Sequence, residues 1–269
     1  MMAARQWVHA LREFRRLTDR YYWQTAFMIA QNNITRQYKN SFLGMAWTVL
    51  QPLTQVAIFA LVMPLIMRFP VQNYVLYLII SYPLWNFFAA TLIQSSHSIL
   101  NQAETLKRCV VSSTVFPIAD VLKNLYTYLV SFATMYLFCV LFLAPFDPIV
   151  LLLPVYLLPV IAALMALAVA VAFVAPYIRD IGEFTLIGMN VIFWLTPVVY
   201  PLEAVPEQVR HWFWLNPFFI MMHPVHELVY YHRLPDAFST LALLTFSAAA
   251  IAAGYAIYRV CRRNYVYYL

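Results

Sequence analysis

The residues best suited to metal or acid–base chemistry lie in the stretch HPVHE, which contains His223, His226 and Glu227. A zinc protease uses the order H-E-x-x-H, in which two histidines one helical turn apart hold the metal beside a glutamate base. Here the order differs, and Pro224 separates the histidines. We therefore expect no metal site and no catalytic residue in this stretch, and interpret the histidines as lying beside a membrane.

A phosphate-binding loop is the second chemistry that a sequence can reveal. It requires glycines in the pattern G-x-x-x-x-G-K-[ST], whose backbone N–H groups surround the phosphates. The chain contains four glycines and no such pattern. We therefore expect no ATP site and no other cofactor in this chain.

The composition is typical of a protein embedded in a lipid bilayer. Hydrophobic residues make up 64% of the chain, charged residues 10%, and the mean hydropathy is +0.71. A soluble domain would carry roughly 25% charged residues. The net charge of +6 does not indicate nucleic-acid binding, because the basic residues are distributed between apolar runs.

Six charge-free runs are long enough to cross a hydrocarbon core about 30 Å thick. They cover residues 40–67, 69–103, 124–146, 148–178, 184–202 and 237–258. The predicted fold is thus an all-α integral membrane protein with six transmembrane helices. Six crossings place both termini on the same side.

The distribution of basic residues predicts which side that is. Lysine and arginine are enriched in cytoplasmic loops. With six crossings and cytoplasmic termini, all 17 lysines and arginines lie inside except Arg68, Arg210 and Arg233. A seventh crossing through residues 211–226 would move the tail outside and weaken this bias.

The region between the fifth and sixth runs is therefore interpreted as an external segment, residues 203–235, that enters the membrane without crossing it. Prolines recur through this region, and each removes a backbone donor from a helix. We expect them to divide it into short re-entrant helices. These prolines are Pro201, Pro206, Pro217, Pro224 and Pro235.

An amphipathic helix is expected over residues 5–28. Basic residues recur every four positions, at Arg12, Arg16 and Arg20, and another face holds Trp7, Leu11, Phe14, Tyr21, Thr25 and Met28. Packing on a partner protein is one interpretation. Lying in the cytoplasmic membrane interface fits better, because Tyr21 and Trp23 are interfacial residue types and arginine attracts anionic headgroups.

The loop NQAETLKRCVVSSTVFP, residues 101–117, is also expected in the cytoplasm. Glu104, Lys107 and Arg108 have helical spacing. The spacing alone fits equally well a surface helix stabilised by its own charge pairs and a helix that contacts another protein.

Several motifs together resemble the ABC-2 type permeases of polysaccharide export, the group that includes O-antigen, capsular polysaccharide and teichoic acid exporters. RQYKNSFLGMAWTVLQP at 36–52 resembles the family's R-Y-K-x-S-x-L-G-x-x-W followed by proline. VFPIADVL at 115–122 and YIRDI at 177–181 are similar to its later loops. TPVVYPLEAVPEQVRHWFWLNPF at 196–218 resembles its external P-x-x-Y-P and N-P segment.

The resemblance implies a permease of the bacterial inner membrane that works as a homodimer with two separate ABC ATPase subunits, which bind ATP and Mg²⁺. It would export a lipid-linked polysaccharide and contact membrane lipids. It divides the chain into a cytoplasmic segment with an interface helix (1–44), a six-helix transmembrane domain (45–258) and a cytoplasmic tail (259–269). Within that domain, residues 101–114 would be the coupling loop and residues 203–235 the external gate.

The resemblance also assigns candidate functional residues. For coupling to the ATPase they are Glu104, Leu106, Lys107 and Arg108. The interface helix would use Arg16, Arg20, Tyr21, Trp23, Arg36 and Lys39. The glycan conduit would use Tyr82, Trp85, Phe88, Trp194 and Tyr200, and the external gate Pro201, Pro206, Trp212, Trp214, Asn216 and Pro217.

Two alternatives remain open. One is an ABC-2 permease for a small molecule or drug, which would differ in the dimensions and lining of its conduit. The other is a membrane enzyme acting on lipid-linked sugars, which would need acids or histidines at membrane depth. The charge-free runs contain no acidic residues.

Overall fold

A computed structural model describes residues 20–67, 73–108, 111–142 and 145–268. Within these ranges every regular element is a helix. The α-helices are α2 (Arg20–Tyr38), α3 (Trp47–Met67), α4 (Tyr74–Ser98), α5 (Ala103–Arg108), α6 (Val115–Phe142), α7 (Leu153–Val174), α8 (Ile181–Leu195), α9 (Glu207–Arg210), α10 (Pro217–Val229) and α11 (Ala237–Cys261). The 3₁₀ turns are η1 (Gly44–Ala46), η2 (Leu100–Gln102), η3 (Pro148–Leu152), η4 (Leu202–Ala204), η5 (His211–Leu215) and η6 (Tyr265–Tyr268).

Among the described residues, five helical stretches are long and apolar enough to cross a membrane. They are Gly44–Ile66, Tyr74–Ser98, Val115–Phe142, Pro148–Val174 and Ala237–Cys261. The chain is therefore a multi-pass membrane protein. The fifth predicted crossing, residues 184–202, corresponds to the apolar helix α8, which has 15 residues. At 1.5 Å per residue α8 is about 22 Å long, and the chain leaves the helix at Thr196.

The third crossing begins earlier than the charge pattern predicted. α6 starts at Val115 rather than at residue 124, so Asp120 and Lys123 lie within the helix. The loop sequence predicts that Pro117 opens this helix, so both residues are expected near its start although charged groups are costly in lipid. In the structure they face the protein interior, where Lys123 Nζ donates a hydrogen bond to Gln94 Oε1 at 3.1 Å.

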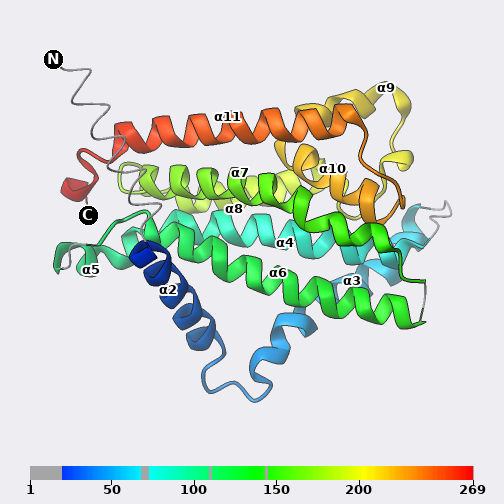
Figure 1. Cartoon of the computed structure of the whole chain (residues 1–269), viewed down its shortest axis with the longest axis horizontal. Helices are drawn as coiled ribbons and strands as arrows, with labels where there is room; N and C mark the ends of the chain where they lie inside the picture. The colour runs from blue at the N-terminus through cyan, green and yellow to red at the C-terminus, as the bar shows by residue number, and fades with distance from the viewer. Residues whose placement is uncertain (1–19, 68–72, 109–110, 143–144, 269) are drawn as a thin grey trace.

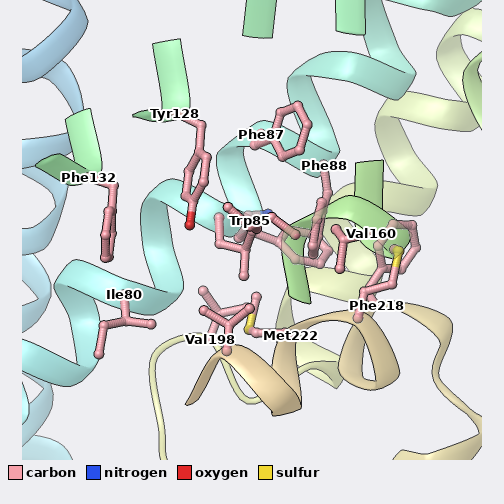
Figure 2. Packing of buried hydrophobic residues seen from close by; sticks show 14 of the residues in the cluster. Ile80, Trp85, Phe87, Phe88, Tyr128, Phe132, Val160, Val198, Phe218 and Met222 are labelled. Carbon is pink, nitrogen blue, oxygen red and sulfur yellow. The ribbon is translucent and has the colours of Figure 1, made fainter. Parts of the chain in front are cut away.

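α4 is the centre of the bundle. It packs against α6, α7, α8, α3 and α10, as seen in Figure 1. In Figure 2, Trp85 and Phe88 of α4 lie beside Phe218 of α10 and Val160 of α7. On the other side of α7, Gly254 lets α11 approach very closely, since a Cβ at this position would lie 2.6 Å from the Ala166 carbonyl oxygen.

The N-terminal amphipathic prediction is partly corrected. The described helix α2 continues to Tyr38, ten residues beyond the predicted end, and Arg16 lies outside the described residues. α2 buries Tyr22, Ala26 and Ala30, whereas Tyr21 and Met28, from the predicted apolar face, are exposed. The four-residue spacing of small alanines lets α2 lie close to α6. The exposure of Met28 is compatible with the predicted position of this helix in the membrane interface.

The two ends of the bundle carry different elements. Figure 1 shows α5 and the residues after α11 at one end, and α9 and α10 at the opposite end. The predicted coupling loop and the predicted external segment therefore lie on opposite sides of the molecule. Between α2 and α3 the chain turns through Gly44, whose φ of +50° is a left-handed conformation that favours glycine.

Candidate functional site

The predicted gate segment forms the short helices η4, α9 and η5, followed by the longer α10. Asn216 begins α10: its Oδ1 accepts hydrogen bonds from the backbone N–H groups of Phe218 (2.9 Å) and Phe219 (3.4 Å). Its Nδ2 donates to Thr196 Oγ1 at 2.8 Å. With Pro217 in the first helical position, this side chain both starts α10 and ties it to the end of α8.

Not every proline in the segment interrupts a helix. Pro201 and Pro206 immediately precede η4 and α9, as predicted for helix-dividing residues. Pro224, however, lies inside α10, which continues to Val229. The prediction was wrong there because a proline removes one helix hydrogen bond, and tertiary packing can outweigh that loss. Pro224 is buried among the residues of α10 that face the bundle.

The two gate tryptophans have different surroundings. Trp212 is 61% exposed. The Trp214 ring packs edge-on against Phe219 at 5.2 Å and Phe238 at 4.7 Å between ring centres. Trp214 therefore fastens η5 to α10 and α11, whereas Trp212 faces outward.

The chain that precedes the predicted gate segment is fastened to α4 by hydroxyl groups. The Tyr77 hydroxyl bonds to the carbonyl oxygens of Pro197 and Tyr200, the latter at 2.9 Å. The Tyr74 hydroxyl donates to the Val199 carbonyl. The chain between α8 and η4 lacks helical hydrogen bonds, so these tyrosines satisfy its carbonyl groups.

His226 is connected to these hydrogen bonds through Ser81, and its imidazole ring is neutral. Burial, together with the smaller effect of the nearby His223, lowers the pKa of His226 to about 3. Ser81 Oγ donates to the Tyr77 carbonyl at 2.7 Å and lies 2.7 Å from His226 Nε2. Because the serine hydroxyl has one hydrogen, His226 Nε2–H is the donor to Ser81.

The remaining chemistry-bearing residues of HPVHE, His223 and Glu227, lie close together, and Glu227 forms an ion pair with Arg233. Glu227 is 2% exposed, and its Oε1 lies 3.0 Å from Arg233 Nη2. His223 Nε2 lies 3.8 Å from the other carboxylate oxygen, Oε2. This arrangement holds the loop after α10 against the helix. Within the described ranges no three His, Cys, Asp or Glu side chains are grouped as metal ligands.

Four of the five predicted conduit residues, all except Tyr200, belong to one aromatic network, which we define as Phe59, Tyr82, Trp85, Phe88, Phe193, Trp194 and Phe218. Ring centres lie 5.8 Å apart for Phe59–Tyr82, 6.1 Å for Phe59–Phe193, 5.7 Å for Trp85–Phe193 and 5.2 Å for Phe193–Trp194. Phe218 connects Trp85 at 5.6 Å with Phe88 at 5.8 Å. These are normal spacings for interacting rings.

The prediction did not include Phe59, Phe193 and Phe218 in the conduit, although they connect its members. Their rings come from α3, α8 and α10. The clustering of aromatic residues along α4 was the signal for Tyr82 and Trp85. No spacing within one helix could indicate which residues of three other helices would meet them.

Exposure divides the aromatic network into a supporting part and an accessible part. Phe88 and Trp85 are buried, at 0% and 5% exposed, whereas Trp194 is 57% exposed. Tyr82 is half-buried. Tyr200 lies outside the network but donates its hydroxyl to the Trp194 carbonyl at 2.8 Å. Trp194 is therefore the most accessible member, and Tyr82, Phe59 and Phe193 are partly accessible to a passing molecule.

At the opposite end, the predicted coupling residues point in different directions. Glu104 and Lys107 are exposed. Leu106 packs against the buried Ile99 and Phe173 and anchors α5 to the bundle. α5 contains Arg108, whose side chain lies outside the described residues. On α2 and the turn that follows it, Arg20, Trp23, Arg36 and Lys39 are exposed.

Comparison with known proteins gives a consistent result. The family model described as "ABC-2 type transporter" matches residues 24–230. The O-antigen export system permease protein RfbA of Myxococcus xanthus is 25% identical over 239 residues, which are 88% of this chain and 92% of that protein. Two proteins of the same name from Klebsiella pneumoniae are 27% and 24% identical, over 73% and 77% of this chain and 76% and 81% of their own lengths.

Proposed function

Because the chain belongs to the ABC-2 type transporter family, we propose that it is the permease subunit that exports a lipid-linked polysaccharide across the bacterial inner membrane. The observation that carries this proposal is the similarity to three O-antigen export permeases over most of the length of each protein. The substrate would be of the O-antigen or capsule type. As a permease the chain is not itself the ATPase, and its family works with a separate ABC ATPase.

In the proposed assembly, two copies of the chain and two ATPase subunits form the transporter, and ATP and Mg²⁺ bind to the ATPases. α8, completed by the residues that follow Leu195, would be the fifth crossing in chain order. It would bring the total to six, so that both termini lie in the cytoplasm. α3 and α8 support pairing of two copies, since both present large apolar side chains outward, among them Leu61, Leu65, Ile187 and Val191.

The aromatic network supports a sugar as the transported group. Sugar rings have apolar faces bordered by hydroxyls, and Trp and Tyr combine a flat apolar surface with a polar edge. Trp194 and Tyr82 would contact successive sugars, while the buried Trp85 and Phe88 hold them in position. The lipid carrier would remain beside the outward apolar faces of α3 and α8.

Energy would enter at α5. In the proposed mechanism, closure of the ATPases on ATP moves α5 through contacts with Glu104 and Lys107, while Arg20, Arg36 and Lys39 hold the interface helix at the headgroups. Such coupling requires contacts that differ between the nucleotide states. No bond of the substrate is made or broken by this chain.

Gene deletion in the native host tests the proposal. Loss of the chain should abolish periodate-labelled polysaccharide on intact cells, cause the lipid-linked glycan to accumulate inside, and be reversed by the wild-type gene. Unchanged surface polysaccharide together with new sensitivity to a drug would favour the small-molecule permease instead.

A single substitution tests the conduit. Trp194→Ala should lower the rate of surface polysaccharide export about two- to tenfold, the range that corresponds to one aromatic contact. Phe184→Ala is the matched control, because Phe184 lies on the same helix α8 and is similarly exposed, at 64%, but lies outside the aromatic network. Equal export by the two variants, with equal amounts of protein in the membrane, would contradict the assignment of Trp194.

A further inference from the structure

Two consecutive hydroxyl residues that follow α5 are bound by tyrosines from distant parts of the chain. Thr114 Oγ1 lies 2.8 Å from the hydroxyl of Tyr22, on α2. Ser113 Oγ is hydrogen-bonded to the hydroxyl of Tyr265, in η6. Ser113 is buried, at 6% exposed. The chain leaving the predicted coupling loop is thus fixed from both sides.

Tyr265 belongs to a segment that is itself fixed to the bundle. Its ring packs edge-on against Phe173 at the end of α7, with 5.2 Å between ring centres. Three residues further on, Tyr268 packs against Tyr177 at 4.7 Å. The Tyr177 hydroxyl donates to the Cys261 carbonyl at the end of α11, at 2.6 Å. The segment after α11 is therefore fastened to both α7 and α11.

The same segment reaches α5 through apolar contacts. Leu106 of α5, Tyr258 of α11 and Tyr265 all pack against the buried cluster of Ile99, Ala172 and Phe173. α5 has six residues, too few to be stable as an isolated helix in water. Its position therefore depends on this cluster and on the bond at Ser113. Tyr265 takes part in both.

We propose that Tyr265 is a positioning residue for energy coupling: its hydroxyl, through Ser113, fixes the exit of the coupling loop to α7 and α11. A displacement of α5 by a partner ATPase is then passed to these two helices as well as to α2. This inference rests on the proposed function, because it assumes that α5 receives the motion of an ATPase.

The pair of hydroxyls allows a double-mutant cycle in the full-length chain. Tyr265→Phe removes the hydroxyl and keeps the ring on Phe173, and Ser113→Ala removes the other partner. Each change should lower the rate of surface polysaccharide export about fivefold, the factor expected for one net hydrogen bond. The double variant should be no worse than either single variant, because both remove the same bond.

Three further measurements distinguish coupling from folding. Tyr268→Phe is the matched control, as it removes a hydroxyl from the same segment and keeps a ring contact with Tyr177. Two quantities should stay within about twofold of wild type in all variants, because each substitution removes only one hydroxyl. They are the amount of permease in the membrane and the ATP hydrolysis rate of the co-purified permease–ATPase complex. Export per ATP hydrolysed should therefore fall only for Tyr265 and Ser113.

Each outcome has a defined meaning. Unchanged export in both single variants, or a product of the two losses in the double variant, overturns the inference. Loss of export that only follows loss of protein overturns it as well. Should Tyr265→Phe fail to accumulate, Ser113→Ala provides the same test from the other partner. Surface polysaccharide that persists in the deletion strain instead overturns the proposed function.

Discussion

α3 and α4 follow one another in the chain, and both are apolar enough to cross a membrane, but their surroundings are opposite. In the most apolar window of α4, 72% of the residues are buried inside the protein, and in that of α3 only 11%. α4, the more buried of the two helices, has the lower mean hydropathy. In a membrane protein the solvent is lipid, so strong hydropathy suits the outside of the bundle at least as well as its centre.

The polar residues explain the difference. α4 buries Ser81, Thr91, Ser95 and Ser96, each at 0% exposed. Ser81 Oγ donates to the Tyr77 carbonyl and Ser96 Oγ to the Ile93 carbonyl, both at 2.7 Å, whereas Thr91 Oγ1 and Ser95 Oγ are buried without a hydrogen-bond partner among the described residues. Hydropathy thus identifies α3 and α4 as crossing helices, and the run of small hydroxyl residues distinguishes α4, the helix that lies inside.

The largest expected effect contrasts one side chain from each helix. Phe88→Ala on α4 should destabilise the folded chain by about 3–5 kcal/mol, because it leaves a cavity among fully packed rings. Leu61→Ala on α3 should cost below about 0.5 kcal/mol, because Leu61 is 73% exposed. Thermal unfolding of the monomeric chain in detergent measures both. Similar melting temperatures would contradict the contrast between the two helices.

A second prediction concerns the pH dependence of stability where His226 of α10 contacts Ser81 of α4. The folded-state pKa of His226 is lowered to about 3, while an unfolded histidine titrates near 6.5. Stability from the neutral ring is therefore present above about pH 6.5 and is lost as the pH falls toward 3, by up to ~1.4 kcal/mol per pH unit.

His226→Gln provides the comparison for this pH dependence. Between pH 6.5 and 4.5 the variant should lose less stability than wild type, by about 2–3 kcal/mol over the two units. Thermal unfolding of both proteins across this range is the measurement. Burial also lowers the pKa of His223, but His223 is present in both proteins, so its contribution cancels. Parallel curves would show that His226 does not set the acid sensitivity.

The smallest effect is expected where α3 contacts α6. Pro52 has no N–H, so the Thr48 carbonyl one turn earlier lacks its helical donor. Ser131 Oγ of α6 donates to this carbonyl at 2.7 Å. Ser131→Ala should therefore cost about 1 kcal/mol.

Adding Pro52→Ala to Ser131→Ala should recover most of that loss, since the new backbone N–H can bond to Thr48. The melting temperatures of the two single variants and the double variant measure this recovery. Additive losses would mean that the Ser131 bond does not replace a missing helical one.

The sequence was sufficient to locate the apolar stretches and to identify the family. The charge-free run alone begins at residue 124, whereas α6 begins at Val115, close to the start predicted from Pro117, because Asp120 and Lys123 are accommodated by protein rather than by lipid. It also could not show that Pro224 would remain inside α10, since that outcome depends on packing against other helices.

The candidate sites were less predictable than the fold. Tyr82 and Trp85 could be selected from their clustering on one helix. Their contacts with Phe59 and Phe193, and the bond between Ser113 and Tyr265, join residues far apart in the chain. Periodicity reports which residues share a face of one helix, and it contains no information about which faces of different helices meet.

The bond from Tyr77 to the Pro197 carbonyl has a consequence for biosynthesis. The two residues are 120 positions apart, and ribosomes add roughly 5–20 residues per second. We therefore expect the hydroxyl of Tyr77 to lie in the membrane for roughly ten seconds before its partner is synthesised. During that interval α4 must rely on temporary neighbours, so this helix is where a slow or defective insertion machinery should first cause misassembly.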